Sequence, residues 1–142
     1  MTPKIAGTIL LDCDIGEIRR ASVWLLDGCN GMDPTRLAEL ELAVVEAVTN
    51  VIRHGNIGGM RQAIELQLAR QENGIKVTIK DRGRSIPEAA LSASESVLDF
   101  DPDDIFNLPE RGLGLALIRE AVDRVDYQTA EGSNTLLLAK SW

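Results

Sequence analysis

Five short segments of the chain carry the residue pattern of β-strands. Apolar and polar side chains alternate in residues 61–70, where Ile64, Leu66 and Leu68 share one face, and again in residues 74–81. The sequence QENG between these two segments indicates a tight hairpin turn. We expect further strands at residues 5–11, 126–130 and 134–142, the last two joined by the turn EGSN.

Three other segments have the apolar spacing of helices. The first is predicted to end near the glycines that follow it, and its apolar side chains are Ile15, Ile18, Val23, Leu25 and Leu26. The second begins with Asp33 as the N-cap and Pro34 as the first helical residue, and runs to about His54, just before Gly55. The third, residues 112–125, opens with two closely spaced glycines.

Residues 86–111 have no such periodicity, and they are acidic and interrupted by prolines. A segment of this length inside a compact domain is either a functional lid or a disordered stretch. A short helix is expected within it, near residues 87–91. The predicted order is strand, helix, helix, strand, strand, lid, helix, strand, strand. This order favours an α+β sandwich over a parallel doubly wound sheet, and the chain length fits one domain, residues 1–142.

Composition narrows the classes of function. The chain has 142 residues, of which 44% are hydrophobic and 26% charged, as in a soluble globular domain. A formal net charge of −7 argues against nucleic-acid binding, which requires a basic face. Because no leader opens the chain and no apolar run approaches about 18 residues, we expect a cytoplasmic protein without membrane association. Cys13 and Cys29 have no metal-ligand spacing and are expected to be reduced and packed.

A polar pair interrupts the second predicted helix. Glu46 and Asn50 are four residues apart, so their side chains lie on the same helix face. Their neighbours are apolar, and a buried carboxylate is costly unless a partner compensates it. Either the helix turns both residues to the surface, or Glu46 accepts a proton and Asn50 offers its amide oxygen to a hard cation.

A carboxylate ends the strand predicted at residues 74–81. Asp81 continues an apolar row on one face of this strand, which Ile79 also occupies. Gly83 follows closely and allows the backbone to approach whatever Asp81 contacts. Asp81 either caps a turn of its own backbone or belongs to a binding site.

Two glycines open the third predicted helix. Gly112 and Gly114 would leave backbone N–H groups free to bind an anion at the positive end of the helix dipole. The same glycines would serve equally well as helix caps or close-packing positions. They do not form a P-loop, because the chain contains no G-x-x-x-x-G-K-[ST] sequence. They do not form a dinucleotide-binding fingerprint either, because Leu117 occupies the position of the third glycine.

The order and spacing of these three motifs resemble the Bergerat ATP-binding fold of the GHKL superfamily, which includes the gyrase B, Hsp90, histidine kinase and MutL ATPase domains. Within it, the chain is similar to the anti-sigma factor serine/threonine kinases of the RsbW and SpoIIAB type in three stretches, VVEAVTNVIRHGN, IKDRGRSIPE and LPERGLGLALI. GSNTLLLAKSW is similar to the closing strands of that family. The resemblance covers nearly the whole chain. It implies a mostly antiparallel, mixed sheet covered on one face by helices, with an ATP lid at about residues 86–111.

The resemblance also implies roles for individual residues. Glu46 matches the proposed general base of the family, and Asn50 matches the residue that holds Mg²⁺ against the phosphates of ATP. Asp81 would accept a hydrogen bond from the adenine amino group, and Gly83 would let the base lie flat against the backbone. The residues that would cradle the phosphates are Gly112, Leu113 and Gly114. The residue that would help to hold the adenine end is Thr135.

Other positions have less specific assignments. Arg53 and His54 end the second predicted helix and could line the edge of the pocket, although a histidine at a helix C-terminus more often complements the dipole. The resemblance also implies that a basic residue on the first helix, Arg19 or Arg20, binds a partner protein. Ser85 replaces the second glycine of the D-x-G-x-G pattern of the superfamily, as is common in the anti-sigma kinases.

The resemblance implies an ATP- and Mg²⁺-dependent protein serine kinase. Its substrate would be a STAS-domain anti-anti-sigma factor, and the same protein would bind a sigma factor and form a homodimer. Two alternatives remain, a kinase-inactive ATP-binding regulator that sequesters a partner and the catalytic fragment of a histidine kinase. The intact Glu46 counts against the first alternative. The position of the only histidine, His54, in the nucleotide-site helix counts against the second.

Overall fold

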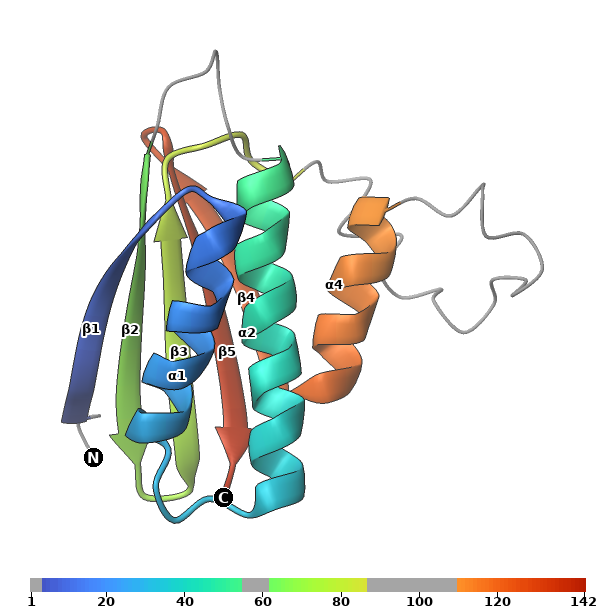
Figure 1. Ribbon diagram of the computed structural model, residues 1–142. Helices are drawn as coiled ribbons and strands as arrows, with labels where there is room; N and C mark the ends of the chain where they lie inside the picture. The colour runs from blue at the N-terminus through green and yellow to red at the C-terminus, as the bar shows by residue number, and fades with distance from the viewer. Residues whose placement is uncertain (1–3, 55–61, 87–109) are drawn as a thin grey trace.

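The computed structural model describes residues 4–54, 62–86 and 110–142. Within these ranges the chain forms a five-stranded sheet (Figure 1). In spatial order its strands are β1 (Lys4–Asp12), β2 (Ala63–Gln71), β3 (Gly74–Asp81), β5 (Ser133–Ser141) and β4 (Arg124–Ala130). Every neighbouring pair of these strands is antiparallel. The described sheet is therefore fully antiparallel, whereas a mostly antiparallel sheet of mixed character was expected.

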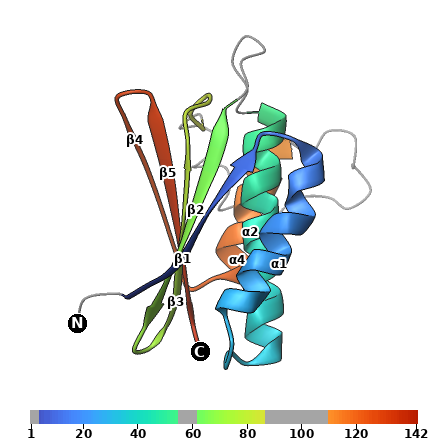
Figure 2. The ribbon, with the colours of Figure 1, turned by 60° about the vertical axis from the view of Figure 1, so that its left-hand side comes forward.

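The helices lie together on one face of this sheet (Figure 2). They are α1 (Ile18–Gly28), which follows a short 3-10 helix η1 (Ile15–Glu17), then α2 (Pro34–His54) and α4 (Glu110–Ala121). The two-layer α+β sandwich predicted from the sequence is therefore confirmed. In the described part of the chain no helix is long and apolar enough to cross a membrane.

Helix α2 is the central helix of the layer, and its start follows the sequence prediction. The carboxylate of Asp33 accepts a hydrogen bond from the backbone N–H of Arg36 at 3.1 Å, which is the geometry of an N-cap. Pro34 is the first helical residue. The face of α2 that packs on the sheet is fully buried at Leu40, Ala43, Val44 and Val48.

The apolar face predicted for the first helix is only partly buried. Leu25 packs in the core together with Ala21, whereas the side chains of Val23 and Leu26 are 51% and 41% exposed. Helix α1 lies on the outer side of the layer and contacts the sheet through a narrow stripe. At its end a Cβ on Gly28 would lie only 2.8 Å from a methyl group of Leu68, so a larger residue there would force the Leu68 side chain to shift.

The third helix is shifted relative to its prediction. It begins at Glu110 rather than at the first glycine, and it ends at Ala121 rather than near residue 125. The backbone N–H of Asp123 already donates to the carbonyl of Ala139 at 2.9 Å, so the chain has joined the sheet by that point. The short helix expected near residues 87–91, and most of the predicted lid, lie outside the described residues.

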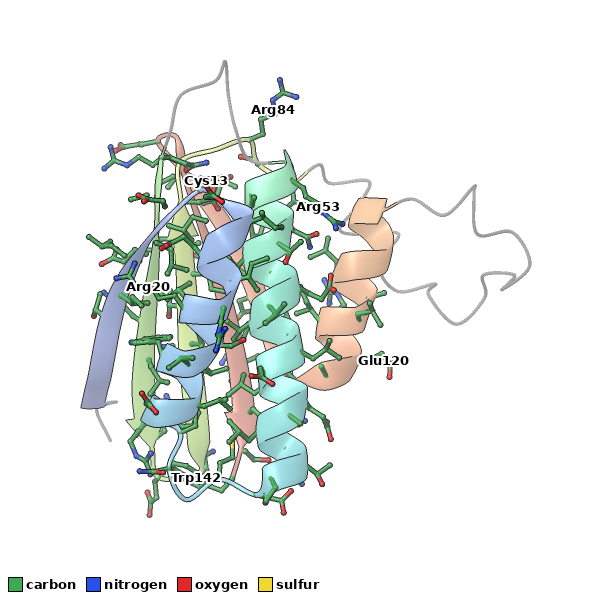
Figure 3. The ribbon with its side chains drawn as sticks, viewed as in Figure 1. Cys13, Arg20, Arg53, Arg84, Glu120 and Trp142 are labelled. Carbon is green, nitrogen blue, oxygen red and sulfur yellow. The ribbon has the colours of Figure 1, made fainter. Side chains whose placement is uncertain are left out.

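Contacts of Arg70 and Trp142 connect distant chain segments at one end of the molecule. Arg70 donates to the carbonyl oxygens of Gly28 and Asn30 at 3.1 and 2.9 Å. Its guanidinium lies 4.6 Å from the ring centroid of Trp142, whose indole N–H donates to the carbonyl of Glu72. Figure 3 shows Trp142 at the opposite end of the molecule from Arg53 and Arg84.

Candidate functional site

An open cavity lies between the sheet and the helices α2 and α4. It encloses about 560 Å³ of empty space, a figure that includes the open solvent at its mouth. Most of its lining is apolar and includes Val51, Ile79, Ile86, Leu115, Ile118 and Leu136. Its polar lining comes from α2, from the end of β3 with the residues after it, and from β4, and consists of Asn50, Asp81, Arg84 and Tyr127. The cavity therefore combines apolar walls with a few polar groups that could orient a ligand.

Asp81 is the buried carboxylate of this cavity. Its side chain is 8% exposed at the end of β3, as the strand alternation predicted. Its Oδ1 atom accepts two hydrogen bonds, from the backbone N–H of Gly83 at 2.8 Å and from Nδ2 of Asn134 at 2.9 Å. Both bonds end on Oδ1, and Oδ2 has no hydrogen-bond partner among the described residues. One carboxylate oxygen is thus available to a donor group on a ligand.

Asn134, to which the sequence motifs assign no role, is the side-chain partner of Asp81. It is 2% exposed and lies directly opposite Asp81 in the pairing of β3 with β5. Thr135, the residue predicted to help hold the adenine end, is the next residue along β5 and projects to the sheet face away from the helices, because Asn134 and Leu136 both face the core. This placement does not support a role for Thr135 at the adenine end. Counting β5 by twos from its buried leucines would have identified Asn134.

The two members of the polar pair on α2, Glu46 and Asn50, differ in their relation to the cavity. Asn50 and Glu46 are both half-buried, and Asn50 lines the cavity. Glu46, one helical turn earlier, is not among the described residues that line it. Arg53, one turn beyond Asn50, is exposed and extends from the cavity end of α2 towards α4 (Figure 3). The side chain of His54 lies outside the described ones.

The glycines of the third motif lie inside α4. Because the helix begins at Glu110, Gly112 falls in its first turn, where backbone N–H groups have no intrahelical partner. Leu113 and Gly114 follow at the end of that turn. The next turn brings Leu115 and Ile118 into the cavity wall. Helix α4 therefore directs its N-terminal end towards the same region that Asn50 and Asp81 line.

The arginines of α1 lie apart from the cavity. Arg20 donates to the carbonyl of Leu10 at 3.0 Å and pairs with Glu17 at 2.9 Å, so it extends towards β1 (Figure 3). Arg19 is exposed.

Both cysteines are free thiols, as predicted, although only one is fully packed. Cys29 is 1% exposed, and burial raises the pKa of its thiol to about 11 against the opposing charge of Arg70. Cys13 is half-buried near the carbonyl of Val51 at the cavity end of α2. Among the described residues no group of three His, Cys, Asp or Glu side chains could hold a metal ion by itself.

Residues 12–140 match the family model of the histidine kinase-like ATPase domain. The chain belongs to this family. Within it, the anti-sigma F factor of Oceanobacillus iheyensis is 30% identical over 106 residues, which are 73% of this chain and 69% of that protein. The anti-sigma F factor of Bacillus thuringiensis is 29% identical over 108 residues, 75% of this chain and 70% of that protein. The RsbW- and SpoIIAB-like assignment made from the sequence motifs is thereby confirmed.

A solved structure of the family supports the fold. It contains the RsbU and RsbW domains of a Mycobacterium tuberculosis protein and superposes with a TM-score of 0.66 at 18% identity. The match covers 95% of this chain and 32% of that one, so the chain spans about a third of the larger protein. The histidine kinase-like ATPase fold thus extends over nearly all of the chain.

Proposed function

We propose that this domain is an ATP-dependent anti-sigma regulator of the cytoplasm. It would phosphorylate a STAS-domain anti-anti-sigma factor on serine or threonine, and it would bind a sigma factor. The observation that carries the proposal is one cavity lined by both Asp81, with a carboxylate oxygen to spare, and Asn50, with an amide oxygen. The relatives named as anti-sigma F factors support the regulatory part.

The adenine base would occupy the Asp81 end of the cavity. The exocyclic amine of adenine is a hydrogen-bond donor, and Oδ2 of Asp81 is an acceptor without a partner among the described residues. The apolar side chains of Ile79 and Leu136 flank this position and suit the faces of a purine ring. The backbone at Gly83 would let the base approach closely.

The phosphates would lie towards α2 and α4. The N–H groups of the first turn of α4 at Gly112, with Leu113 and Gly114 beside them, would donate hydrogen bonds to phosphate oxygens at the positive end of the helix dipole. The exposed guanidinium of Arg53 extends towards the same end of α4 (Figure 3) and would add a positive charge.

A hard oxygen donor fits Mg²⁺, and Asn50 supplies one through its amide. A single protein ligand suffices for a magnesium ion that is held mainly by nucleotide phosphates and water. When bound, the ion would neutralise phosphate charge during the transfer.

The transfer itself would be an in-line displacement. The substrate hydroxyl oxygen forms a bond to the γ-phosphorus as the bond from that phosphorus to the β–γ bridging oxygen breaks, and ADP leaves. Glu46 would take the hydroxyl proton as the general base. The α4 amides would steady the negative charge that develops on the phosphoryl oxygens.

A second candidate function is a kinase-inactive regulator that binds ATP and sequesters a partner protein. The specific observation that favours it is the position of Glu46, which is half-buried and outside the described lining of the cavity. In this case ATP would set the conformation that the partner recognises, and no phosphoryl group would move.

Calorimetry with ATP and Mg²⁺ tests the site, using the wild type, Asp81→Asn and Glu46→Ala. We expect ATP binding to the wild type, retention of binding by Glu46→Ala, and loss of at least about tenfold in affinity for Asp81→Asn, because a hydrogen bond to a charged group is broken. Unchanged affinity in Asp81→Asn would place the base elsewhere. A wild type that binds no nucleotide would overturn the proposal altogether.

Phosphotransfer to a STAS-domain partner from labelled ATP separates the two candidate functions. Transfer by the wild type that is lost in Glu46→Ala, with ATP affinity unchanged, supports the kinase. ATP binding without transfer supports the sequestering regulator. Light scattering in the same buffer tests the homodimer that the family resemblance implies.

A further inference from the structure

Asn134 connects the Asp81 carboxylate to the backbone segment that follows β3. Its Nδ2 atom lies 2.9 Å from Oδ1 of Asp81, 3.0 Å from the carbonyl oxygen of Gly83 and 3.4 Å from that of Arg84. Its Oδ1 atom accepts a hydrogen bond from the hydroxyl of Ser85 at 2.8 Å. The buried amide of Asn134 thus contacts four residues at and just after the end of β3, which are Asp81, Gly83, Arg84 and Ser85.

The chemistry of these contacts fixes the orientation of the Asn134 amide. On the Nδ2 side all three neighbours are oxygen acceptors, so only the NH₂ group is compatible there. On the other side, the hydroxyl of Ser85 supplies a donor to Oδ1. A rotated amide would place an oxygen against three oxygens. The hydrogen bond from Ser85 therefore stabilises the Asn134 amide in its one favourable orientation.

The oriented amide in turn fixes the carboxylate. Oδ1 of Asp81 receives both Nδ2 of Asn134 and the N–H of Gly83, so this oxygen is occupied and the side chain is held in one rotamer. The remaining oxygen, Oδ2, is then presented at a constant position in the cavity that Asp81 lines. Without the amide, the carboxylate could rotate, and Oδ1 could compete as an acceptor.

We propose that Ser85 and Asn134 act together as positioning residues that make the cavity selective for a purine with a 6-amino group. This inference rests on the proposed binding of ATP and adds the origin of its base selectivity. Ser85 acts through Asn134, and Asn134 acts through Asp81. A site built around a single oriented acceptor rejects a base that lacks the matching donor, because the acceptor is then left unpaired.

The experiment compares the affinities of two nucleotides by calorimetry, ATP and purine riboside 5′-triphosphate, which lacks the 6-amino group. Their ratio is the base selectivity. The variants are Ser85→Ala, Asn134→Ala and the double variant, and Ser85→Thr is the matched control that keeps the hydroxyl. Melting temperatures are measured alongside, and Ser85→Ala, at a surface position, keeps the test valid if Asn134→Ala does not fold.

We expect the wild type to prefer ATP by at least about tenfold. Ser85→Ala should lower this selectivity about fivefold, the equivalent of one neutral hydrogen bond, and Ser85→Thr should retain it. The double variant should show no further loss beyond Asn134→Ala, because the two residues act in series.

A purely structural role for the pair gives a different result, in which both nucleotides weaken equally and the selectivity ratio stays at the wild-type value. That result, or additive losses in the double variant, would overturn the inference. A wild type that binds both nucleotides equally would also overturn it, although the proposed ATP site would stand. Absence of binding to either nucleotide would instead remove the proposed function itself.

Discussion

The ammonium group of Lys140 on β5 lies 2.7 Å from the carboxylate of Glu39 on α2 and 2.7 Å from the carbonyl oxygen of Ala121, the last residue of α4. Lys140 is only 6% exposed, whereas the side chain of Glu39 is 42% exposed. The charge stabilises the negative end of the α4 dipole and joins both helices to the sheet. Lys140 therefore fixes the end of α4 that lies away from the cavity.

Replacing Lys140 by methionine should lower the free energy of unfolding by about 2 kcal/mol, because the buried carbonyl of Ala121 loses its donor. The partner variant Glu39→Gln should cost less than about 1 kcal/mol, because Glu39 is half-exposed and its charge is screened by solvent. Urea unfolding of the two variants and the wild type measures both values. Equal losses in the two variants would contradict the importance of the bond to Ala121.

Asn50→Ala should remove the contribution of magnesium to ATP binding. We expect the wild type to bind ATP more tightly with Mg²⁺ than with EDTA, and the variant to bind ATP with nearly the same affinity in both, because the amide oxygen that holds the ion is gone. Calorimetry in the two buffers gives the ratio. Asn30→Ala, an exposed asparagine of the α1–α2 loop, is the matched control. A wild-type magnesium effect that persists in Asn50→Ala would place the ion elsewhere.

Gly74→Ala should destabilise the sheet. A Cβ at this position would lie 2.8 Å from the Cα of Ser141 and closer still to the carbonyl of Lys140, both of which belong to the backbone of β5. Because backbone atoms cannot rotate away, strands β3 and β5 would have to separate, at a cost of about 2 kcal/mol or more. Gly16→Ala is the control, since the nearest atom to its Cβ would be a side-chain oxygen at 3.5 Å. Similar unfolding free energies for the two variants would refute the argument.

The buried thiol of Cys29 should make the protein sensitive to alkaline pH. Because burial raises its pKa from 9.0 to about 11, its contribution to stability is fully present below pH 9 and is lost as the pH rises through 11. The wild type should therefore lose more stability between these pH values than Cys29→Ala, which has no thiol to ionise. Urea midpoints measured across this range test the difference, and parallel curves would contradict it.

The parts of the fold that were predictable from the sequence are those with local causes. Asp33 and Pro34 specify the start of α2 through capping and backbone geometry. The period of two places Asp81 on the core face of β3 whatever the rest of the chain does. The helix period likewise places Glu46 and Asn50 one turn apart on α2, although only Asn50 is among the described residues that line the cavity.

The parts that were not predictable depend on distant segments. The hydrogen bond between Ser85 and Asn134 joins positions 49 residues apart, and neither residue alone indicates it. The exposure of Val23 reflects the outer position of α1, which its own apolar spacing does not encode. Thr135 came from the family resemblance alone, whereas the alternation along β5 turns its neighbour Asn134 to the core.

The pairing of Asp81 with Asn134 across β3 and β5 also has a consequence for folding. A slip of β5 by one residue would turn Asn134 to the outer face and bring Thr135 inwards, because side chains alternate along a strand. A chain misaligned in this way would lack the arrangement that holds Asp81 and, under the proposed function, would not bind ATP. Because a ligand stabilises only the form that binds it, bound ATP would then favour the correctly aligned β5.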